Sequence, residues 1–163
     1  MESLPLSKLT IEAYSMRSVE ILQAVARGEI DFGLCFSPLV HPQIEIRKLG
    51  TEPLGLCLRS SHPLLKRLGN RPFPFKELSK LPYIAAKSFH GIDNCEQHPC
   101  LVEKGIVPNS KVIFDSYDAM ITCVSKSDAW SIVPRIVCQG AKGLHWFLPD
   151  WKASADVCCL WPK

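Results

Sequence analysis

One segment of the chain, residues 22–36, changes its hydrophobic period partway along and constrains the fold more than any other. Before Gly28, apolar residues such as Val19 and Leu22 recur at helical spacing, and Gly28 stands where a helix often ends in a left-handed conformation. After it, residues 30–36 are apolar on nearly both faces, which is typical of a strand covered by helices on either side. The segment predicts a helix followed by a buried strand of an α/β fold.

The residues before this helix extend the pattern to a β-α-β unit. Residues 9–14 alternate, with Leu9, Ile11 and Ala13 on one face, and this predicts a strand. Ser15 follows, and its hydroxyl is suited to accept hydrogen bonds from the free amides of the helix's first turn. Two strands joined by such a helix are expected to be parallel, with a right-handed crossover.

Short strand-like and helical patterns fill the rest of the chain. Residues 64–76 contain many turn-forming residues and are predicted to lead into a second lobe. Gly105 is predicted to end a helix, and Ser116 to begin one whose apolar residues follow the i, i+3, i+4, i+7 rule. In chain order we expect strands at 44–49, 54–59 and 83–86, a helix at 99–104, a strand at 111–114, the helix after Ser116, and strands at 130–133, 144–148 and 157–161.

Five short motifs in this order resemble the effector-binding (substrate-binding) domain of LysR-type transcriptional regulators. The first is Gly-Glu-Ile-Asp-Phe-Gly-Leu at 28–34, and the others are residues 52–64, 78–84, 115–120 and 127–134. The resemblance covers roughly residues 10–161 and implies a two-lobed, periplasmic-binding-protein-like (type 2) α/β architecture. It assigns residues 1–60 and 141–163 to lobe I and residues 61–140 to lobe II. Because the match begins at the family's second strand, lobe I is expected to be incomplete.

The resemblance also implies a function. Such a domain senses a small effector, for which an anion is one candidate, between its lobes and thereby changes how the full-length regulator holds DNA. DNA contact would pass through an N-terminal helix-turn-helix domain that has no counterpart in this sequence, and a homo-oligomer is a further expected partner. The alternatives are a solute-binding protein or an enzyme on the same bilobal fold, and a truncated regulator that acts through mixed oligomers.

Five polar residues occupy predicted strand-to-helix turns, where ligands of open α/β sheets bind. Ser15 and Ser116 each combine a hydroxyl with the free amides of a helix start, an arrangement suited to a carboxylate. Capping alone explains each serine equally well, and a solvated loop lysine is the common alternative for Lys87. The candidate effector-binding residues are Ser15, Ser37, Lys87, Ser88 and Ser116.

The cysteines raise the question of a metal or of disulfides. Most of the eight lie in or beside apolar runs, where a free thiol behaves as a small hydrophobe: Cys35, Cys57, Cys123, Cys138, Cys158 and Cys159. Cys95, His98 and Cys100 offer clustered zinc-ligand types, but the sequence has no second cluster with the usual paired spacing. The sequence therefore favours reduced thiols, with no metal and no cofactor.

Composition and missing motifs disfavour several other functions. The formal charge of +3 is spread among interspersed Lys, Arg, Asp and Glu, which gives no basic stripe for nucleic acid. No apolar stretch approaches the roughly 20 residues of a membrane span, and residues 1–10 lack a secretory pattern, so we expect a cytoplasmic protein. There is no Gly-x-Ser-x-Gly, no phosphate-binding loop and no His-Glu-x-x-His, so we expect no enzymatic activity.

Overall fold

A computed structural model describes residues 10–68, 75–87, 99–107 and 110–163. None of the helices in these ranges is long and apolar enough to cross a membrane. The elements in chain order are α1 (Ser18–Ala26), β1 (Gly33–Phe36), β2 (Ile44–Arg59), α2 (Pro63–Leu68), α3 (Phe75–Leu78), β3 (Pro82–Ala86), α4 (Pro99–Lys104), β4 (Ser110–Phe114), α5 (Tyr117–Ser125), β5 (Ser131–Pro134), α6 (Arg135–Cys138), β6 (Leu144–Phe147) and β7 (Ser154–Pro162).

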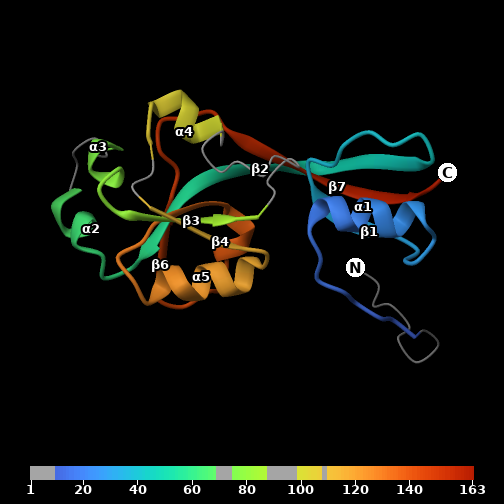
Figure 1. Ribbon diagram of the computed structural model, residues 1–163, viewed down its shortest axis with the longest axis horizontal. Helices are drawn as coiled ribbons and strands as arrows, with labels where there is room; N and C mark the ends of the chain where they lie inside the picture. The colour runs from blue at the N-terminus through green and yellow to red at the C-terminus, as the bar shows by residue number, and fades with distance from the viewer. Residues whose placement is uncertain (1–9, 69–74, 88–98, 108–109) are drawn as a thin grey trace.

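Two long antiparallel strands, β2 and β7, connect two lobes (Figure 1). Their register runs from Ile44 opposite Pro162 to Pro53 opposite Ser154. The sheet order is β1-β7-β2-β5, with β6 also paired to β2, and β3 and β4 form a separate parallel pair. We call α1, β1 and the adjoining halves of β2 and β7 the smaller lobe, and α2 to α6 with β3 to β6 and the other half of β2 the larger lobe.

The core of the smaller lobe lies between α1 and the sheet. Ile21, Leu22 and Val25 of α1 pack against Cys35 of β1 and Leu160 of β7. The helix lies very close to β1, because a Cβ atom added at Gly33 would stand 2.1 Å from the Cγ2 methyl of Ile21. The predicted helix end at Gly28 is confirmed by its φ of +70°.

The core of the larger lobe is centred on Trp130, which is fully buried. Its ring lies against Tyr83, with ring centroids 4.5 Å apart, and its indole N–H donates to the carbonyl of Leu78 at 3.0 Å. The backbone of Trp130 also bonds β3, because its N–H donates to Pro82 and its carbonyl accepts from Ile84. Trp130 therefore holds β3 beside β5 by both its side chain and its backbone.

Most of the elements predicted after residue 44 are confirmed. The strands at 83–86, 111–114, 144–148 and 157–161 correspond to β3, β4, β6 and β7, and the helix after Ser116 is α5. The helix at 99–104 is α4, which ends before Gly105 with its φ of +61°. The two strands expected at 44–49 and 54–59 are one strand, β2, with a register irregularity between Lys48 and Gly50.

The predicted parallel β-α-β unit is wrong. Within residues 10–14 no strand forms, and β1 pairs antiparallel with β7, with Cys35 opposite Cys158. Ser15 does not cap α1, because the helix begins later in the chain, with Arg17 as the N-cap. The carboxylate of Glu20 accepts the backbone N–H of Arg17 at 3.0 Å and fixes this start.

The prediction of a strand covered on both faces at residues 30–36 is also wrong. The strand is limited to Gly33–Phe36, at the end of the sheet order. Phe32 and Leu34 are 60% and 55% exposed. The apolar pattern was correct for the face against α1, but in the described part of the chain no element covers the opposite face.

Candidate functional site

A pocket of about 400 Å³ lies where the two lobes meet. Its walls come from the start of α1 and from β1 on one side, and from the ends of β3 and β4 and the start of α5 on the other. Val157 of β7 and Ile136 of α6 complete it. The lining residues are Ser15, Met16, Arg17, Ser18, Ile21, Leu34, Cys35, Phe36, Ser37, Ala86, Lys87, Asp115, Ser116, Tyr117, Asp118, Ile136 and Val157.

The fold brings four of the five predicted site residues to this pocket, although they come from distant parts of the sequence. Ser15 and Ser37 belong to the smaller lobe, and Lys87 and Ser116 to the larger lobe. Ser88 lies outside the described residues. The role of these residues in effector binding stays a prediction.

Two helices begin at the pocket, one from each lobe. The N-caps of α1 and α5, Arg17 and Ser116, both line it. The first backbone N–H groups of a helix have no partner within that helix and carry partial positive charge. Ser116 is the N-cap that we predicted, but its side chain makes no capping hydrogen bond. Its hydroxyl is therefore not used to satisfy its own helix.

Ser37 has an unusual backbone conformation. Its φ is +41°, in the left-handed region of backbone conformation that residues other than glycine rarely adopt. Hydrogen bonds to β7 hold it there: its N–H donates to the carbonyl of Asp156 at 2.7 Å, and its Oγ accepts the N–H of Asp156 at 3.0 Å. Strain of this kind is found disproportionately at ligand sites.

The side-chain charges around the pocket balance. Arg17 and Lys87 line it together with Asp115 and Asp118. Hydrogen bonds from Arg17 hold the pKa of Glu20 below its usual value, and the charge of Lys87 adds to this effect. The lining side chains therefore give no excess of positive charge, and Arg17 is already paired with Glu20, so the helix starts are the remaining source of positive partial charge at the pocket.

One wall of the pocket is aromatic and apolar. The rings of Phe36 and Tyr117 meet edge to face across the lobes, with centroids 6.3 Å apart and planes at 82°. Burial raises the pKa of Tyr117 to about 12, so this phenol stays neutral. Burial, with a smaller contribution from Cys158, also raises the pKa of Cys35 to about 12, which makes this lining cysteine a poor nucleophile. The pocket thus combines an apolar, aromatic wall with polar residues at the helix starts.

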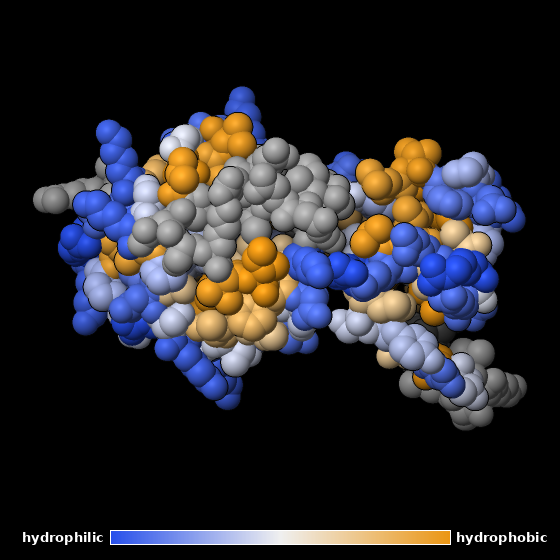
Figure 2. Space-filling view, viewed as in Figure 1, coloured by the Kyte–Doolittle hydropathy of each residue, from blue (hydrophilic) through white to orange (hydrophobic). Residues whose placement is uncertain are grey.

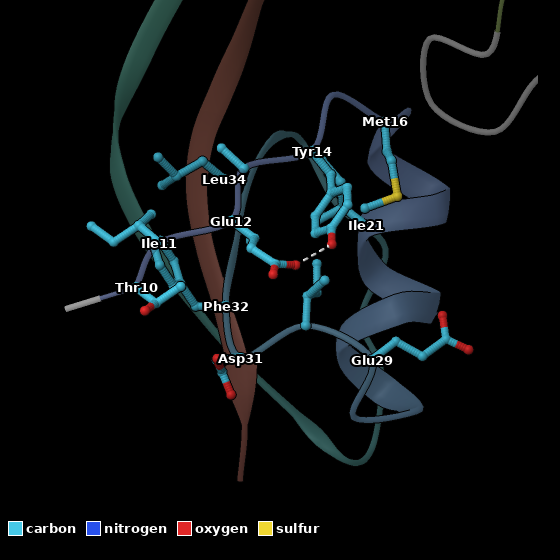
Figure 3. A pocket seen from close by; sticks show the side chains of 13 residues that line it. Thr10, Ile11, Glu12, Tyr14, Met16, Ile21, Glu29, Asp31, Phe32 and Leu34 are labelled. Carbon is cyan, nitrogen blue, oxygen red and sulfur yellow. Dashed lines mark hydrogen bonds between the residues drawn. The ribbon is translucent and has the colours of Figure 1, made fainter.

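A larger groove of about 560 Å³ lies in the smaller lobe alone. Figure 3 shows its walls, which are the extended residues 10–14 on one side and β1 with the end of α1 on the other. Tyr14 donates to Glu12 at 2.6 Å inside it, and Ile11, Phe32 and Leu34 give it an apolar surface. Among the described strands β1 stands at the end of the sheet order, and the groove lies beside it, so the groove has the character of a sheet edge more than of a ligand cavity.

The metal prediction is tested only in part. Within residues 10–68, 75–87, 99–107 and 110–163, no group of three or more His, Cys, Asp or Glu side chains is placed to hold a metal ion. Cys95 and His98 lie outside these ranges. Cys100 is fully buried, and burial raises the pKa of its thiol to about 12.

Sequence reasoning missed several lining residues that the geometry adds. Ser18 was assigned to a helix, Phe36 to a strand and Tyr117 to the apolar face of the helix after Ser116, and Arg17 was given no role. Arg17 and Ser18 could have been found from the rule already used for Ser15, because a ligand at a helix start meets several residues of the first turn. No signal in the sequence pairs Phe36 with Tyr117, which are 81 positions apart by their numbers.

Comparison with known families identifies the domain. Residues 7–163 match the family model described as the LysR substrate binding domain. The chain belongs to this family. The resemblance inferred from the sequence motifs is thus confirmed, and so is the absence of enzymatic function, because LysR regulatory domains are not enzymes.

Solved structures of LysR effector-binding domains share the fold. The effector binding domain of a BenM variant matches with a TM-score of 0.74 and 19% identity, over 96% of this chain and 74% of that one. The BenM domain with its effector benzoate matches at 0.68 and 18%, over 92% and 68%. The QuiR domain in complex with shikimate matches at 0.69 and 19%, over 88% and 68%. The chain spans about half, 52%, of a full-length BenM mutant.

Proposed function

We propose that this LysR domain senses a small carboxylate, bound in the pocket between its lobes, for a transcriptional regulator. One observation carries the proposal: the N-termini of α1 and α5, from different lobes, line a single cavity. A helix start carries partial positive charge and N–H groups without a partner inside the helix, which suit a carboxylate without the need for a basic cluster. At α1 the carboxylate of Glu20 already accepts the Arg17 N–H, so the start of α5 is the main anion site of this proposal.

The other lining residues support a ligand with one negative charge and an apolar or hydroxylated body. Phe36 and Tyr117 offer a surface for a ring, and Ser15 and Ser116 line the same pocket with hydroxyls that can donate to oxygen atoms. Asp115 and Asp118 disfavour a second negative charge. Benzoate and shikimate, the ligands named for the BenM and QuiR domains, have this chemistry.

Binding between the lobes gives a route to regulation. A ligand held by Ser15 and Arg17 on one side and Ser116 on the other would favour one relative position of the lobes, with β2 and β7 as the connection. In the whole regulator, located in the cytoplasm, this change would pass to a DNA-binding domain and to neighbouring subunits. The assignment of residues 1–60 and 141–163 to lobe I and 61–140 to lobe II is part of this proposal.

A comparison of charged and neutral ligands tests the function. We expect benzoate or shikimate to bind to this chain at least about tenfold more tightly than its carboxamide, because the amide keeps the shape but loses the charge-assisted hydrogen bonds. Isothermal titration calorimetry measures both dissociation constants. Equal affinity for acid and amide, or no binding of either acid at millimolar concentration, would contradict the proposal.

We also propose that the smaller lobe is incomplete as described and that the groove beside β1 is the place of one further strand. The support is the end position of β1 in the sheet, the apolar groove along its edge, and the exposure of Leu34. Figure 2 shows apolar side chains on the surface of this lobe as well as the larger one. An open apolar edge of this kind favours association with another chain, as a regulator acting through mixed oligomers requires.

Replacing one groove residue should reduce this association. We expect the chain to self-associate as its concentration rises and the Leu34→Lys variant to stay monomeric, because a lysine at a strand edge opposes pairing. Sedimentation velocity measures both. Val40→Lys is the matched control, since Val40 is 93% exposed but lies outside the groove. The proposal would be refuted if the wild-type chain stayed monomeric at every concentration. It would also be refuted if Leu34→Lys and Val40→Lys reduced self-association equally.

A further inference from the structure

Two cysteines from separate parts of the larger lobe lie in contact. The sulfur atoms of Cys57, in β2, and Cys138, the last residue of α6, are 3.3 Å apart. All seven cysteines in the described part of the chain, including these two, are free thiols. A disulfide needs a sulfur–sulfur distance of about 2.05 Å, so a small movement separates this contact from a covalent bond.

The two thiols are chemically unequal. Cys57 is fully buried, whereas Cys138 is partly exposed at the surface. The hydrogen bond between them lowers the pKa of Cys138, whose thiolate Cys57 can stabilise, and raises the pKa of Cys57, which burial raises further. Cys138 is therefore the thiol that solutes reach and that ionises first, with Cys57 directly behind it.

The backbone after Cys138 is suited to a small movement. Helix α6 is a single short turn, and it is followed by Gly140 and Gly143, both with positive φ of +85° and +77°. A Cβ added at either glycine would meet no atom within 4 Å, so nothing packs against these two positions on that side. Cys57, by contrast, is fixed by strand pairing on both sides, opposite Ser131 and Trp146. Closure of the bond would move α6 toward β2.

We infer that Cys57 and Cys138 form a reversible disulfide when the protein meets hydrogen peroxide. The Cys138 thiolate attacks the peroxide, forming a sulfenic acid and releasing water after protonation. Cys57 lies in contact with that sulfur and attacks it while its own proton passes to the departing oxygen, so no free Cys57 thiolate is needed. The S–S bond forms, the S–O bond breaks and a second water leaves. Two thiols lose two electrons and two protons in total, and hydrogen peroxide is reduced to two waters.

The disulfide would act on the ligand pocket through α6. Ile136 of this helix lines the pocket, two residues before Cys138. Fixing α6 against β2 therefore changes one wall of the site, an effect that rests on the proposed function. We expect oxidation to change the dissociation constant for benzoate or shikimate by about fivefold or more, in the range of ordinary coupling between sites.

The experiment treats the folded chain with hydrogen peroxide, alkylates the remaining thiols after unfolding, and identifies cross-linked peptides by mass spectrometry. We expect a peptide pair joined through Cys57 and Cys138 that dithiothreitol cleaves, with the other thiols still alkylated. The matched control is Cys123→Ser, because Cys123 is a partly exposed thiol in the same core cluster and this variant should still form the bond. Cys138→Ser should leave Cys57 as a free thiol.

Two results would overturn the inference. In the first, Cys138 is oxidised to sulfinic acid while Cys57 is still recovered as an alkylated free thiol. In the second, Cys57 forms a disulfide with a different cysteine equally well in the Cys138→Ser variant. The peptide measurement needs no effector, so it stands even if benzoate and shikimate fail to bind. If the bond forms and the affinity for a bound acid does not change, the coupling to the pocket is wrong.

Discussion

Replacing Trp130 with alanine should lower the free energy of unfolding by about 3–5 kcal/mol, the usual cost of removing a large buried aromatic side chain. The indole is fully buried, its ring packs on Tyr83, and its N–H satisfies the carbonyl of Leu78. The substitution leaves a cavity and removes one of the two hydrogen bonds to the Leu78 carbonyl, which still accepts the backbone N–H of Leu81 at 3.0 Å. Because domains are stable by about 5–15 kcal/mol, this loss is a large part of the total.

The measurement is urea denaturation followed by far-UV circular dichroism, since the tryptophan itself is removed from the fluorescence signal. Trp130→Phe is the graded variant: it keeps most of the ring contact with Tyr83 and loses the hydrogen bond to Leu78, so we expect a smaller loss of about 1–3 kcal/mol. If the alanine variant unfolds within about 0.5 kcal/mol of wild type, Trp130 does not hold the larger lobe as we describe.

The larger lobe could be predicted well from sequence because its elements are local. Gly105 and Ser116 mark a helix end and a helix start by their own chemistry, and the helix after Ser116 has an unambiguous apolar face. These signals depend on neighbouring residues, and the structure confirms them. The motifs of the family added the two-lobed architecture, which no single local pattern contains.

The smaller lobe could not be predicted in the same way. Residues 10–14 have a strand-like alternation, but a strand also needs a neighbour to accept its hydrogen bonds, and sequence alternation does not supply one. The predicted parallel pairing of β1 was wrong for a related reason. Its partner is β7, more than a hundred positions away, and its apolar residues are equally compatible with parallel and antiparallel pairing.

In the candidate site too, features set by neighbouring residues could be predicted, and features set by distant segments could not. Turns after strands could be recognised in the sequence, and four of the five residues chosen on that basis line one pocket. The strained backbone of Ser37 and the contact of Phe36 with Tyr117 depend on how β7 and the two lobes come together. They required the three-dimensional structure.

A large loss of ligand affinity is expected at Ser116, because the proposed carboxylate binds where the helix starts converge. Ser116→Asp introduces a negative charge at the N-cap of α5. Asp and Asn cap helices as well as Ser does, so neither variant should lose stability. Two like charges about 4 Å apart at an effective dielectric constant of about 20 repel by about 4 kcal/mol.

We therefore expect Ser116→Asp to weaken the binding of benzoate or shikimate by about 100-fold or more. Ser116→Asn is the matched control, because it has nearly the same shape and keeps the polar group without the charge. It should stay within about fivefold of wild type. Thermal unfolding of both variants, run beside the titrations, shows whether the helix cap is preserved.

The most direct measurement is the calorimetric titration of Ser116→Asp and Ser116→Asn with the same acid under the same conditions. The account predicts that the aspartate variant loses at least about two orders of magnitude in affinity while the asparagine variant does not, with both folded to the same stability. Equal affinity of the two variants would show that the carboxylate does not lie at the start of α5, and the proposed site would be wrong.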